Sequence, residues 1–291
     1  MAEANPDLRP PISGTTRLAA VIGHPVRHSL SPVLLNAAFA ATGMDWTFVA
    51  LEVAAGNTAR AIDGLRTLGL AGLSVTMPHK GAVASLVDHC HETAEQLAAV
   101  NCVAVEDGNL VGYNTDGDGF IDGLVRDAGR DVVGGTAVVL GAGGAARAIV
   151  QALGRSGAAE VLVANRTPDR AENAALLAGS AGRTVAMVEI PDAVRSANLV
   201  VNATPVGMGV DPNPSAPTPI DPGLLRVGQV VVDLVYHPLE TSWLVEVRRR
   251  GVEAYGGLSM LIFQAARAFS LWTGREAPVD AMEIAARAAL V

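Results

Sequence analysis

The feature that most constrains the fold is a glycine-rich turn in the middle of the chain. Residues 141–146 read Gly-Ala-Gly-Gly-Ala-Ala, follow an apolar run at 136–140 and open a helix-like segment at 145–153. A strand, a tight turn of small residues and a helix N-terminus let the backbone approach a pyrophosphate, which the first helical amides then bind. The turn therefore predicts a parallel sheet with a dinucleotide at the carboxyl end of this strand.

A second strand-like run, residues 161–164, ends in polar residues where such a fold binds the adenosine ribose. NAD-binding chains usually carry an Asp or Glu near this point, which accepts hydrogen bonds from the ribose hydroxyls. This chain carries Asn165, Arg166 and Thr167 instead, with Arg170 three residues further on. These donors suit a 2′-phosphate, which arginine can bind through two parallel hydrogen bonds. The segment predicts NADP as the cofactor; the alternative, a ligand-free turn beside solvated arginines, stays open.

Composition limits the classes to which the chain can belong. Half of its 291 residues are apolar and 17% are charged, enough for two globular domains. The net charge of −8 argues against nucleic acid as a partner. No apolar run reaches the roughly 18 to 20 residues of a membrane span, and no signal peptide precedes the first strand, so no membrane association is expected. Two cysteines, Cys90 and Cys102, make no disulfide framework, and the expected location is the cytoplasm.

Strand-like and helix-like segments alternate on both sides of the glycine turn. Besides the two named above, expected strands cover residues 18–22, 46–53, 72–76, 100–105, 109–113, 199–202 and 230–234, with a turn at 106–108. Expected helices cover 32–41, with Ser31 as N-cap, and 57–68, 118–128, 258–272 and 279–290. The Pro-rich stretch 211–222 is expected to be a loop.

This alternation predicts an α/β fold with two open-sheet domains. Residues 1–115 form the first part of one domain, which the resemblance described below makes the substrate domain. Residues 116–256 form a central Rossmann-like NADP domain. The C-terminal helices, residues 257–291, are expected to return and complete the first domain.

Three groups of residues outside the glycine turn carry chemistry. Ser29 and Ser31 follow the first strand and open a helix, where hydroxyls and helix amides suit a carboxylate. Lys80 lies just after the third strand, and Asp116 follows the fifth. Two of these groups have a plainer interpretation: Ser31 as a helix cap, and Lys80 as a surface lysine.

Metal sites and hydrolase chemistry find no support. Residues 113–119 are rich in Asp and Gly but lack the glutamate that ends a calcium loop. The triplet at 89–91, His-Cys-His, has no second pair at zinc spacing and is expected at a helix end near solvent. No G-x-S-x-G elbow occurs.

Taken in order, eight motifs between residues 21 and 272 resemble those of the shikimate dehydrogenase family. They are Gly23-x-Pro25-x-x-His28-Ser29-x-Ser31-Pro32; Val75-Thr76-x-Pro78-x-Lys80; Asn114-Thr115-Asp116-Gly117; Gly141 to Ala145; Asn165-Arg166-Thr167-x-x-Arg170; Asn202-Ala203-Thr204-Pro205-x-Gly207-Met208; Asp233-x-Val235-Tyr236-x-Pro238-x-x-Thr241; and Gln264-Ala265-Ala266. The resemblance implies reversible, NADPH-dependent reduction of 3-dehydroshikimate to shikimate, on the route to chorismate and the aromatic amino acids.

The resemblance also implies roles for individual residues. The implied catalytic dyad is Lys80 and Asp116. The implied substrate ligands are Ser29, Ser31, Ser74, Thr76, Asn101, Asp116, Tyr236 and Gln264. The implied NADP contacts are Gly141, Ala142, Gly143, Gly144, Ala145, Asn165, Arg166, Thr167, Arg170, Leu234 and Gly257.

Two positions depart from the family pattern. Ser74 stands where the family often has asparagine, which is a ligand of a substrate hydroxyl. The sequence therefore leaves open which ring hydroxyls of the substrate the site prefers. Cys102 stands where threonine is common and is expected to pack. The alternatives are a paralogue acting on quinate or aminoshikimate, another small-acid dehydrogenase and, from a different class, a catalytically silent NADP-binding module. A homodimer is a further hypothesis.

Overall fold

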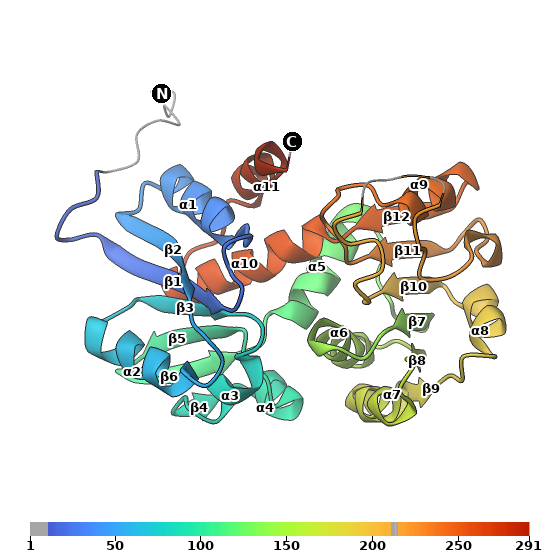
Figure 1. The fold of residues 1–291 in the computed structure, drawn as a ribbon, viewed down its shortest axis with the longest axis horizontal. Helices are drawn as coiled ribbons and strands as arrows, with labels where there is room; N and C mark the ends of the chain where they lie inside the picture. The colour runs from blue at the N-terminus through green and yellow to red at the C-terminus, as the bar shows by residue number, and fades with distance from the viewer. Residues whose placement is uncertain (1–10, 211–212, 214, 291) are drawn as a thin grey trace. The chain divides into compact units, whose positions relative to one another are not determined.

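The computed structural model describes residues 11–210, 213 and 215–290, which divide into two compact units. The first unit comprises residues 11–115 and 264–289, and the second comprises residues 116–263 (Figure 1). The division near the C-terminus falls inside one helix, α10 (Leu258–Thr273), whereas the sequence analysis places it at residue 257. Part of the expected loop at 211–222 lies outside the described residues.

The first unit is built on a mixed sheet with the strand order β2-β1-β3-β5-β6-β4. Its strands are β1 (Arg17–Gly23), β2 (Trp46–Glu52), β3 (Gly72–Val75), β4 (His89–Cys90), β5 (Cys102–Glu106) and β6 (Asn109–Tyr113). Strand β1 pairs in parallel with β2 and β3, whereas β5 is antiparallel to both β3 and β6. Asp107 and Gly108 join β5 to β6 with positive φ angles of 49° and 83°, as a two-residue hairpin turn requires.

Helices cover both faces of this sheet (Figure 1). They are α1 (Ser31–Ala41), α2 (Thr58–Leu68), α3 (Lys80–Ala84), α4 (Glu92–Leu97), the second half of α10, and α11 (Val279–Ala289). One face packs against α2 and α3 through a cluster that includes Ile22, Leu65 and Val83. Helix α10 packs aromatic rings on the other face, where Trp272 stacks on Phe48 with ring centroids 5.8 Å apart.

The second unit is built on an all-parallel sheet with the strand order β12-β11-β10-β7-β8-β9. Its strands are β7 (Thr136–Leu140), β8 (Glu160–Ala164), β9 (Gly182–Thr184), β10 (Leu199–Asn202), β11 (Val230–Asp233) and β12 (Glu253–Gly256). Counted from β7, this is the order 3-2-1-4-5-6 of doubly wound dinucleotide-binding sheets. The direction of winding reverses between β7 and β10, and ligands of such sheets bind at that point.

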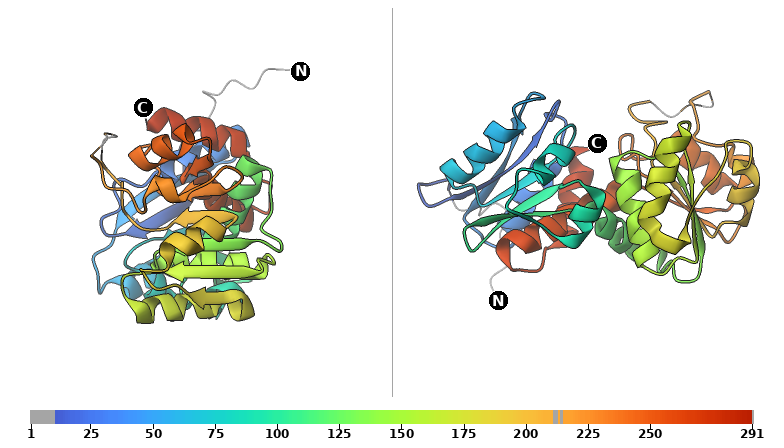
Figure 2. Two further views of the ribbon diagram at one scale, coloured as in Figure 1. Left: turned by 90° about the vertical axis from the view of Figure 1, so that its right-hand side faces the viewer. Right: turned by 90° about the horizontal axis from the view of Figure 1, so that it is seen from below.

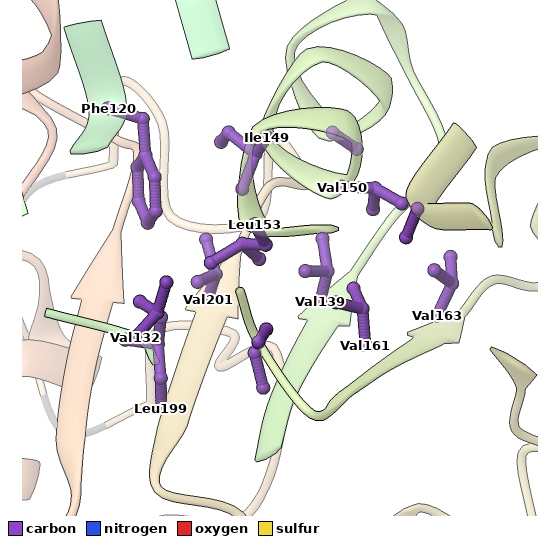
Figure 3. Packing of buried hydrophobic residues seen from close by; sticks show 14 of the residues in the cluster. Phe120, Val132, Val139, Ile149, Val150, Leu153, Val161, Val163, Leu199 and Val201 are labelled. Atoms are coloured by element: carbon purple, nitrogen blue, oxygen red, sulfur yellow. The ribbon is translucent and has the colours of Figure 1, made fainter. Parts of the chain in front are cut away.

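Alternate residues of these strands face two separate cores, one on each side of the sheet. Val139 and Val201 pack under the helices α5 (Asp116–Ala128), α6 (Gly144–Arg155) and α7 (Pro168–Ala175), where Figure 3 shows Ile149 and Leu153. Val138 and Val200 belong to the core on the other side of the sheet. Helices α8 (Ile190–Ser196) and α9 (Ser242–Arg249) cover that side (Figure 2). Each fully buried aliphatic side chain contributes roughly 1.5–3 kcal/mol, so the sheet is stabilised from both faces.

Helices α5 and α6 approach closely because of a glycine. A Cβ at Gly117 would lie 2.4 Å from the carbonyl oxygen of Ala148, well inside contact distance. Gly117 is the second residue of α5, and it follows Asp116. The absent side chain therefore allows the helix that begins with Asp116 to pack against the helix of the glycine turn.

Most expected strands and helices are confirmed within two residues at each end, but one local prediction is wrong. Ser31 is not an N-cap: α1 begins at Ser31 itself, and the Ser31 amide donates a hydrogen bond to Oγ of Ser29 at 3.2 Å. The triplet at 89–91 lies at a helix end near solvent, as expected, because His91 is the N-cap of α4. Its first two residues, His89 and Cys90, also form the short strand β4, which pairs with β6.

We predict that Gly117→Ala lowers the free energy of unfolding by about 1–3 kcal/mol, because the added methyl group must displace helix backbone. Gly64→Ala is the matched control, since a Cβ at this position of α2 meets no atom within 4 Å. It should raise stability by about 0.5–1 kcal/mol through helix propensity. Urea unfolding of the two variants measures both effects, and equal stabilities would contradict the close contact.

Candidate functional site

Two loops of the first unit are joined at the carboxyl ends of β1 and β3. The amide of Thr76 donates to the Ile22 carbonyl oxygen at 2.9 Å, and the amide of His24 donates to that of Met77 at 2.9 Å. A Cβ at Gly23 would lie 2.4 Å from the Thr76 methyl group. Glycine at the end of β1 therefore lets the two loops lie against each other at one edge of the sheet.

The loop after β1 presents the two predicted serines. Ser29 is half-buried, and its amide donates to the Val26 carbonyl oxygen at 3.0 Å. Ser31 is buried at the first position of α1. The structure thus places both hydroxyls beside the N-terminus of a helix, where the first amides favour an anion such as a carboxylate.

Ser74 and Thr76 lie on one face at the end of β3, because alternate residues of a strand point the same way. Gly72 shares that face, and a Cβ there would meet the Trp272 indole at 2.5 Å. Helix α10 therefore covers this face. Gln264 precedes Trp272 by eight residues, about 12 Å along the helix, and Thr76 follows Gly72 by about 13 Å along the strand.

A buried amide connects α10 to the sheet. Asn101 is 4% exposed, and its Oδ1 accepts a hydrogen bond from the Thr115 amide at 2.8 Å. The Thr115 hydroxyl donates in turn to the main-chain oxygen of Gln264 at 3.0 Å. The amide of Val75 donates to the Asn101 carbonyl oxygen at 2.7 Å. The structure therefore brings Asn101 and Gln264 to the edge where Thr76 lies.

Lys80 is the only lysine in the 291-residue sequence, and its neighbours hold its backbone firmly. It is the first residue of α3, and its carbonyl oxygen accepts a hydrogen bond from the Val100 amide at 2.9 Å. The preceding residue, His79, is 1% exposed. Its ring nitrogens lie 2.8 Å from the Thr58 hydroxyl and 2.7 Å from the Val53 carbonyl oxygen.

The His79 contacts use both ring nitrogens. A carbonyl oxygen can only accept, so Nε2 carries a proton and donates to Val53, while Nδ1 and the Thr58 hydroxyl form the second hydrogen bond. This buried imidazole ties the backbone before Lys80 to α2 and to the segment after β2.

Asp116 lies in the second unit, as the first residue of α5 rather than two residues before it. It is 7% exposed. A carboxylate at this position is favoured by the helix dipole. Lys80 belongs to the first unit, so the two members of the predicted dyad come from different units.

The glycine turn after β7 has the geometry of an anion cradle. Gly141 has a φ of +111°, and a Cβ on it would lie 2.9 Å from the Ala203 carbonyl oxygen. A Cβ at Gly143 or Gly144 would meet no atom within 4 Å, so open space adjoins the backbone there. Helix α6 begins at Gly144, and no side chain caps its N-terminus. Its first amides therefore suit a pyrophosphate, as expected from the sequence.

The end of β8 suits the adenosine 2′-phosphate of NADP. Arg166 and Arg170 are exposed, and neither has an ion-pair partner among the residues that the structure describes. Asn165 donates through Nδ2 to the Thr167 carbonyl oxygen at 3.0 Å, which holds the loop. Exposed guanidinium groups that are not already paired with a carboxylate can bind a phosphate through charged hydrogen bonds.

The carboxyl end of β11 carries the other predicted contacts. Asp233, for which the sequence predicted no role, holds their backbone in place. Leu234 and Tyr236 follow Asp233, and a Cβ at Gly257 would lie 2.0 Å from the Leu234 carbonyl oxygen. Burial raises the pKa of the Tyr236 phenol, so its hydroxyl keeps its proton at neutral pH. Asp233 itself is fully buried, and its position in a sequence motif does not show that burial.

Other expectations concern cysteines, metals and membranes. Cys102 is fully buried, as expected, and burial raises the pKa of its thiol. Within residues 11–210, 213 and 215–290, no group of three or more His, Cys, Asp or Glu side chains is arranged to hold a metal ion. The helices formed by those same residues include none with the length and apolarity of a membrane span.

Family models match most of the chain. One described as the shikimate dehydrogenase substrate binding domain matches residues 21–103. One described as shikimate / quinate 5-dehydrogenase matches residues 124–208, and one described as the shikimate 5'-dehydrogenase C-terminal domain matches residues 257–287.

Curated relatives match over nearly their full length. The chain is 47% identical to a shikimate dehydrogenase (NADP(+)) from Moorella thermoacetica, covering 96% of this chain and 95% of that one. It is 46% identical to the protein of the same name from Symbiobacterium thermophilum, covering 95% and 96% of the two chains.

Solved structures share the fold. A shikimate dehydrogenase in complex with NADP+ has a TM-score of 0.89 and 36% identity, covering 96% of this chain and 98% of that chain. The Thermus thermophilus shikimate 5-dehydrogenase, in complex with NADP(H) and shikimate, has a TM-score of 0.85 and 39% identity, covering 94% and 100%. A quinate dehydrogenase from Corynebacterium glutamicum, in complex with NAD, has a TM-score of 0.85 and 33% identity, covering 93% and 98%.

We predict that Thr58→Val lowers the free energy of unfolding by about 1–3 kcal/mol, because Nδ1 of the buried His79 loses its hydrogen-bond partner. Thr67→Val is the matched control on the same helix, since the Thr67 hydroxyl donates to the Asp63 carbonyl oxygen at an exposed position. Its effect should stay within about 0.5 kcal/mol. Urea unfolding compares the two, and a Thr58 variant as stable as the Thr67 variant would contradict the stabilising role of the buried hydrogen bond.

Proposed function

The chain belongs to the shikimate dehydrogenase family, and we propose on this premise that it catalyses the reversible, NADP-dependent interconversion of shikimate and 3-dehydroshikimate. The observation that carries the proposal is the edge formed by the ends of β1 and β3. Three hydroxyls, those of Ser29, Ser31 and Thr76, lie at this edge together with the only lysine of the chain. The reaction requires the protein to bind a polyhydroxylated carboxylate and to supply a proton donor.

The first unit supplies the substrate contacts in this proposal. Ser29 and Ser31 bind the carboxylate beside the N-terminus of α1, where hydroxyl and amide donors meet the negative charge. The ring hydroxyls are bound by the polar side chains that border β3, namely Ser74, Thr76, Asn101 and Gln264, with Tyr236 from the second unit. Ser74, whose side chain is shorter than asparagine, reaches one hydroxyl at most.

The second unit supplies the NADP contacts. Residues 141–145 bind the pyrophosphate through backbone amides, and the donors at 165–170 bind the 2′-phosphate. Leu234 and Gly257 border the nicotinamide. The open space beside Gly143 and Gly144 supports this assignment, as do the two exposed guanidinium groups.

The proton moves through Lys80 and Asp116. When bound, NADPH supplies a hydride to the ring carbonyl carbon, and the carbonyl oxygen must then gain one proton. In the reductive direction Lys80 donates this proton to the oxygen, and in the oxidative direction its amine takes the proton back. Asp116 is the second member of the dyad that the family resemblance implies.

Two further points of the sequence analysis stay predictions. The free thiols of Cys90 and Cys102 support the cytoplasm, a reducing compartment, as the location. The homodimer has no support among the described residues, and sedimentation of the purified protein decides it.

We predict that shikimate with NADP⁺ gives the highest kcat/KM among the four pairs of shikimate or quinate with NADP⁺ or NAD⁺. The expected preference for NADP⁺ is about tenfold or more, equivalent to the roughly 1.4 kcal/mol that a charged hydrogen bond to phosphate supplies. Absorbance of the reduced nicotinamide measures all four rates. A preference for quinate would favour the quinate paralogue, and equal rates with NAD⁺ would contradict the role of Arg166 and Arg170.

We predict that Lys80→Ala lowers kcat by about 10²- to 10⁴-fold, because the carbonyl oxygen loses its proton donor. An amine-selective reagent provides an independent test, since Lys80 is the only side-chain amine in the sequence. Acetylation should inactivate the protein in step with modification of Lys80, and shikimate with NADP⁺ should protect it. The α-amino group is the control, because its acetylation in the Lys80→Ala variant should change nothing. Full activity after acetylation of Lys80 would remove this residue from the mechanism.

A further inference from the structure

A fully buried carboxylate lies at the carboxyl end of β11, at the ligand-binding edge of the parallel sheet. Asp233 is 0% exposed and accepts three hydrogen bonds. Its Oδ1 accepts from Nδ2 of Asn202 at 2.8 Å and from the Val235 amide at 3.2 Å. Its Oδ2 accepts from the Thr241 hydroxyl at 2.8 Å. Among the described residues, no cation pairs with this carboxylate.

The first of these bonds reaches the loop after β10. Asn202 is the register partner of Asp233 on β10. Its Oδ1 accepts hydrogen bonds from the amide of Thr204 at 3.1 Å and from the Thr204 hydroxyl at 2.6 Å. The Thr204 methyl group would lie 3.3 Å from a Cβ at Gly141. Asp233 thereby holds the loop that lies against the start of the glycine turn.

The other two bonds close the connection between β11 and α9. Thr241 is the N-cap of α9, and its hydroxyl oxygen also accepts from the Leu244 amide at 3.3 Å. The Val235 carbonyl oxygen accepts from the Gly257 amide at 3.1 Å. The segment between Asp233 and Thr241 carries Leu234 and Tyr236. Both of its ends are therefore tied to one carboxylate.

We propose that Asp233 is a positioning residue that sets the loops after β10 and β11 for the nicotinamide half of NADP. The inference rests on the proposed function. In a doubly wound sheet each half binds one mononucleotide. Strands β7 and β8 carry the proposed pyrophosphate contacts at 141–145 and the proposed adenosine 2′-phosphate contacts at 165–170, so β10 to β12 face the nicotinamide.

The energetic cost of this carboxylate supports a positioning role. A buried anion without a cation is expensive, and burial raises the pKa of Asp233 while its three donors oppose the rise. Asparagine would avoid the charge, but it offers one acceptor oxygen instead of two and turns an NH₂ group toward a donor. Only a carboxylate accepts from Asn202, Val235 and Thr241 together.

The experiment compares two ligands that touch different halves of the cofactor site. The variants are Asp233→Asn and Arg166→Gln, and the probes are NADPH and adenosine 2′-monophosphate, which lacks the nicotinamide and the pyrophosphate. We expect Asp233→Asn to lower kcat/KM for NADPH at least tenfold and to change the Kd for adenosine 2′-monophosphate less than twofold. Arg166→Gln should weaken adenosine 2′-monophosphate at least tenfold. Calorimetry gives the binding constants.

Each remaining outcome decides the matter. Equal losses for both probes in Asp233→Asn would make Asp233 a general stabiliser and overturn the proposal, as would an unchanged kcat/KM. If wild-type protein bound neither probe, the proposed function itself would fail. If Asp233→Asn does not fold, Thr241→Val must show the same selective loss of kcat/KM for NADPH. Thr241→Ser, which keeps the hydroxyl, should retain the wild-type kcat/KM. A loss shared by both probes again overturns the proposal.

Discussion

Parallel hydrogen bonding between neighbouring strands is the constraint on which the rest of this protein depends. Because β7, β8, β10 and β11 run in one direction, their carboxyl ends meet at one edge of the second sheet. The glycine turn, the loop at 165–170 and the Asp233 network are brought to that edge by the pairing alone. In the first unit, β1 and β3 are parallel for the same reason, and their loops bring Ser29 and Thr76 together.

Close backbone approach and buried polar groups then position the loops at these edges. Gly23, Gly117 and Gly141 each stand where a Cβ would collide with a neighbouring segment. His79 and Asp233 are buried, and every hydrogen-bonding atom of their side chains has a protein partner. Such groups are costly to bury unless satisfied, so each favours one loop arrangement over its alternatives. The backbone before Lys80 and the loops after β10 and β11 both depend on such contacts.

Local signals predicted most of the elements. The apolar run of β10 matches the expected strand at both ends, and α2 ends at Leu68, as expected, because Gly69 adopts the left-handed conformation. Strands β4, β9 and β12 were missed because their short sequences, His-Cys, Gly-Arg-Thr and Glu-Ala-Tyr-Gly, carry no apolar periodicity. They are strands because β6, β8 and β11 offer them backbone partners. Likewise Ser31 was misjudged because the hydroxyl that binds the first amide of α1 belongs to Ser29.

The sequence by itself determined the chemistry of this protein: a pyrophosphate turn, donors in place of the usual ribose acceptor, hydroxyls beside a helix start, and one lysine. These depend on residue type and short spacing, which local conformation preserves. Only the tertiary structure decided that Gln264 lies near Asn101, that His79 ties the backbone before Lys80 to α2, and that Asp233 links two loops. The hydrogen bond from Thr115 to Gln264, for example, joins residues 149 positions apart, and such pairings arise from packing that no local pattern contains.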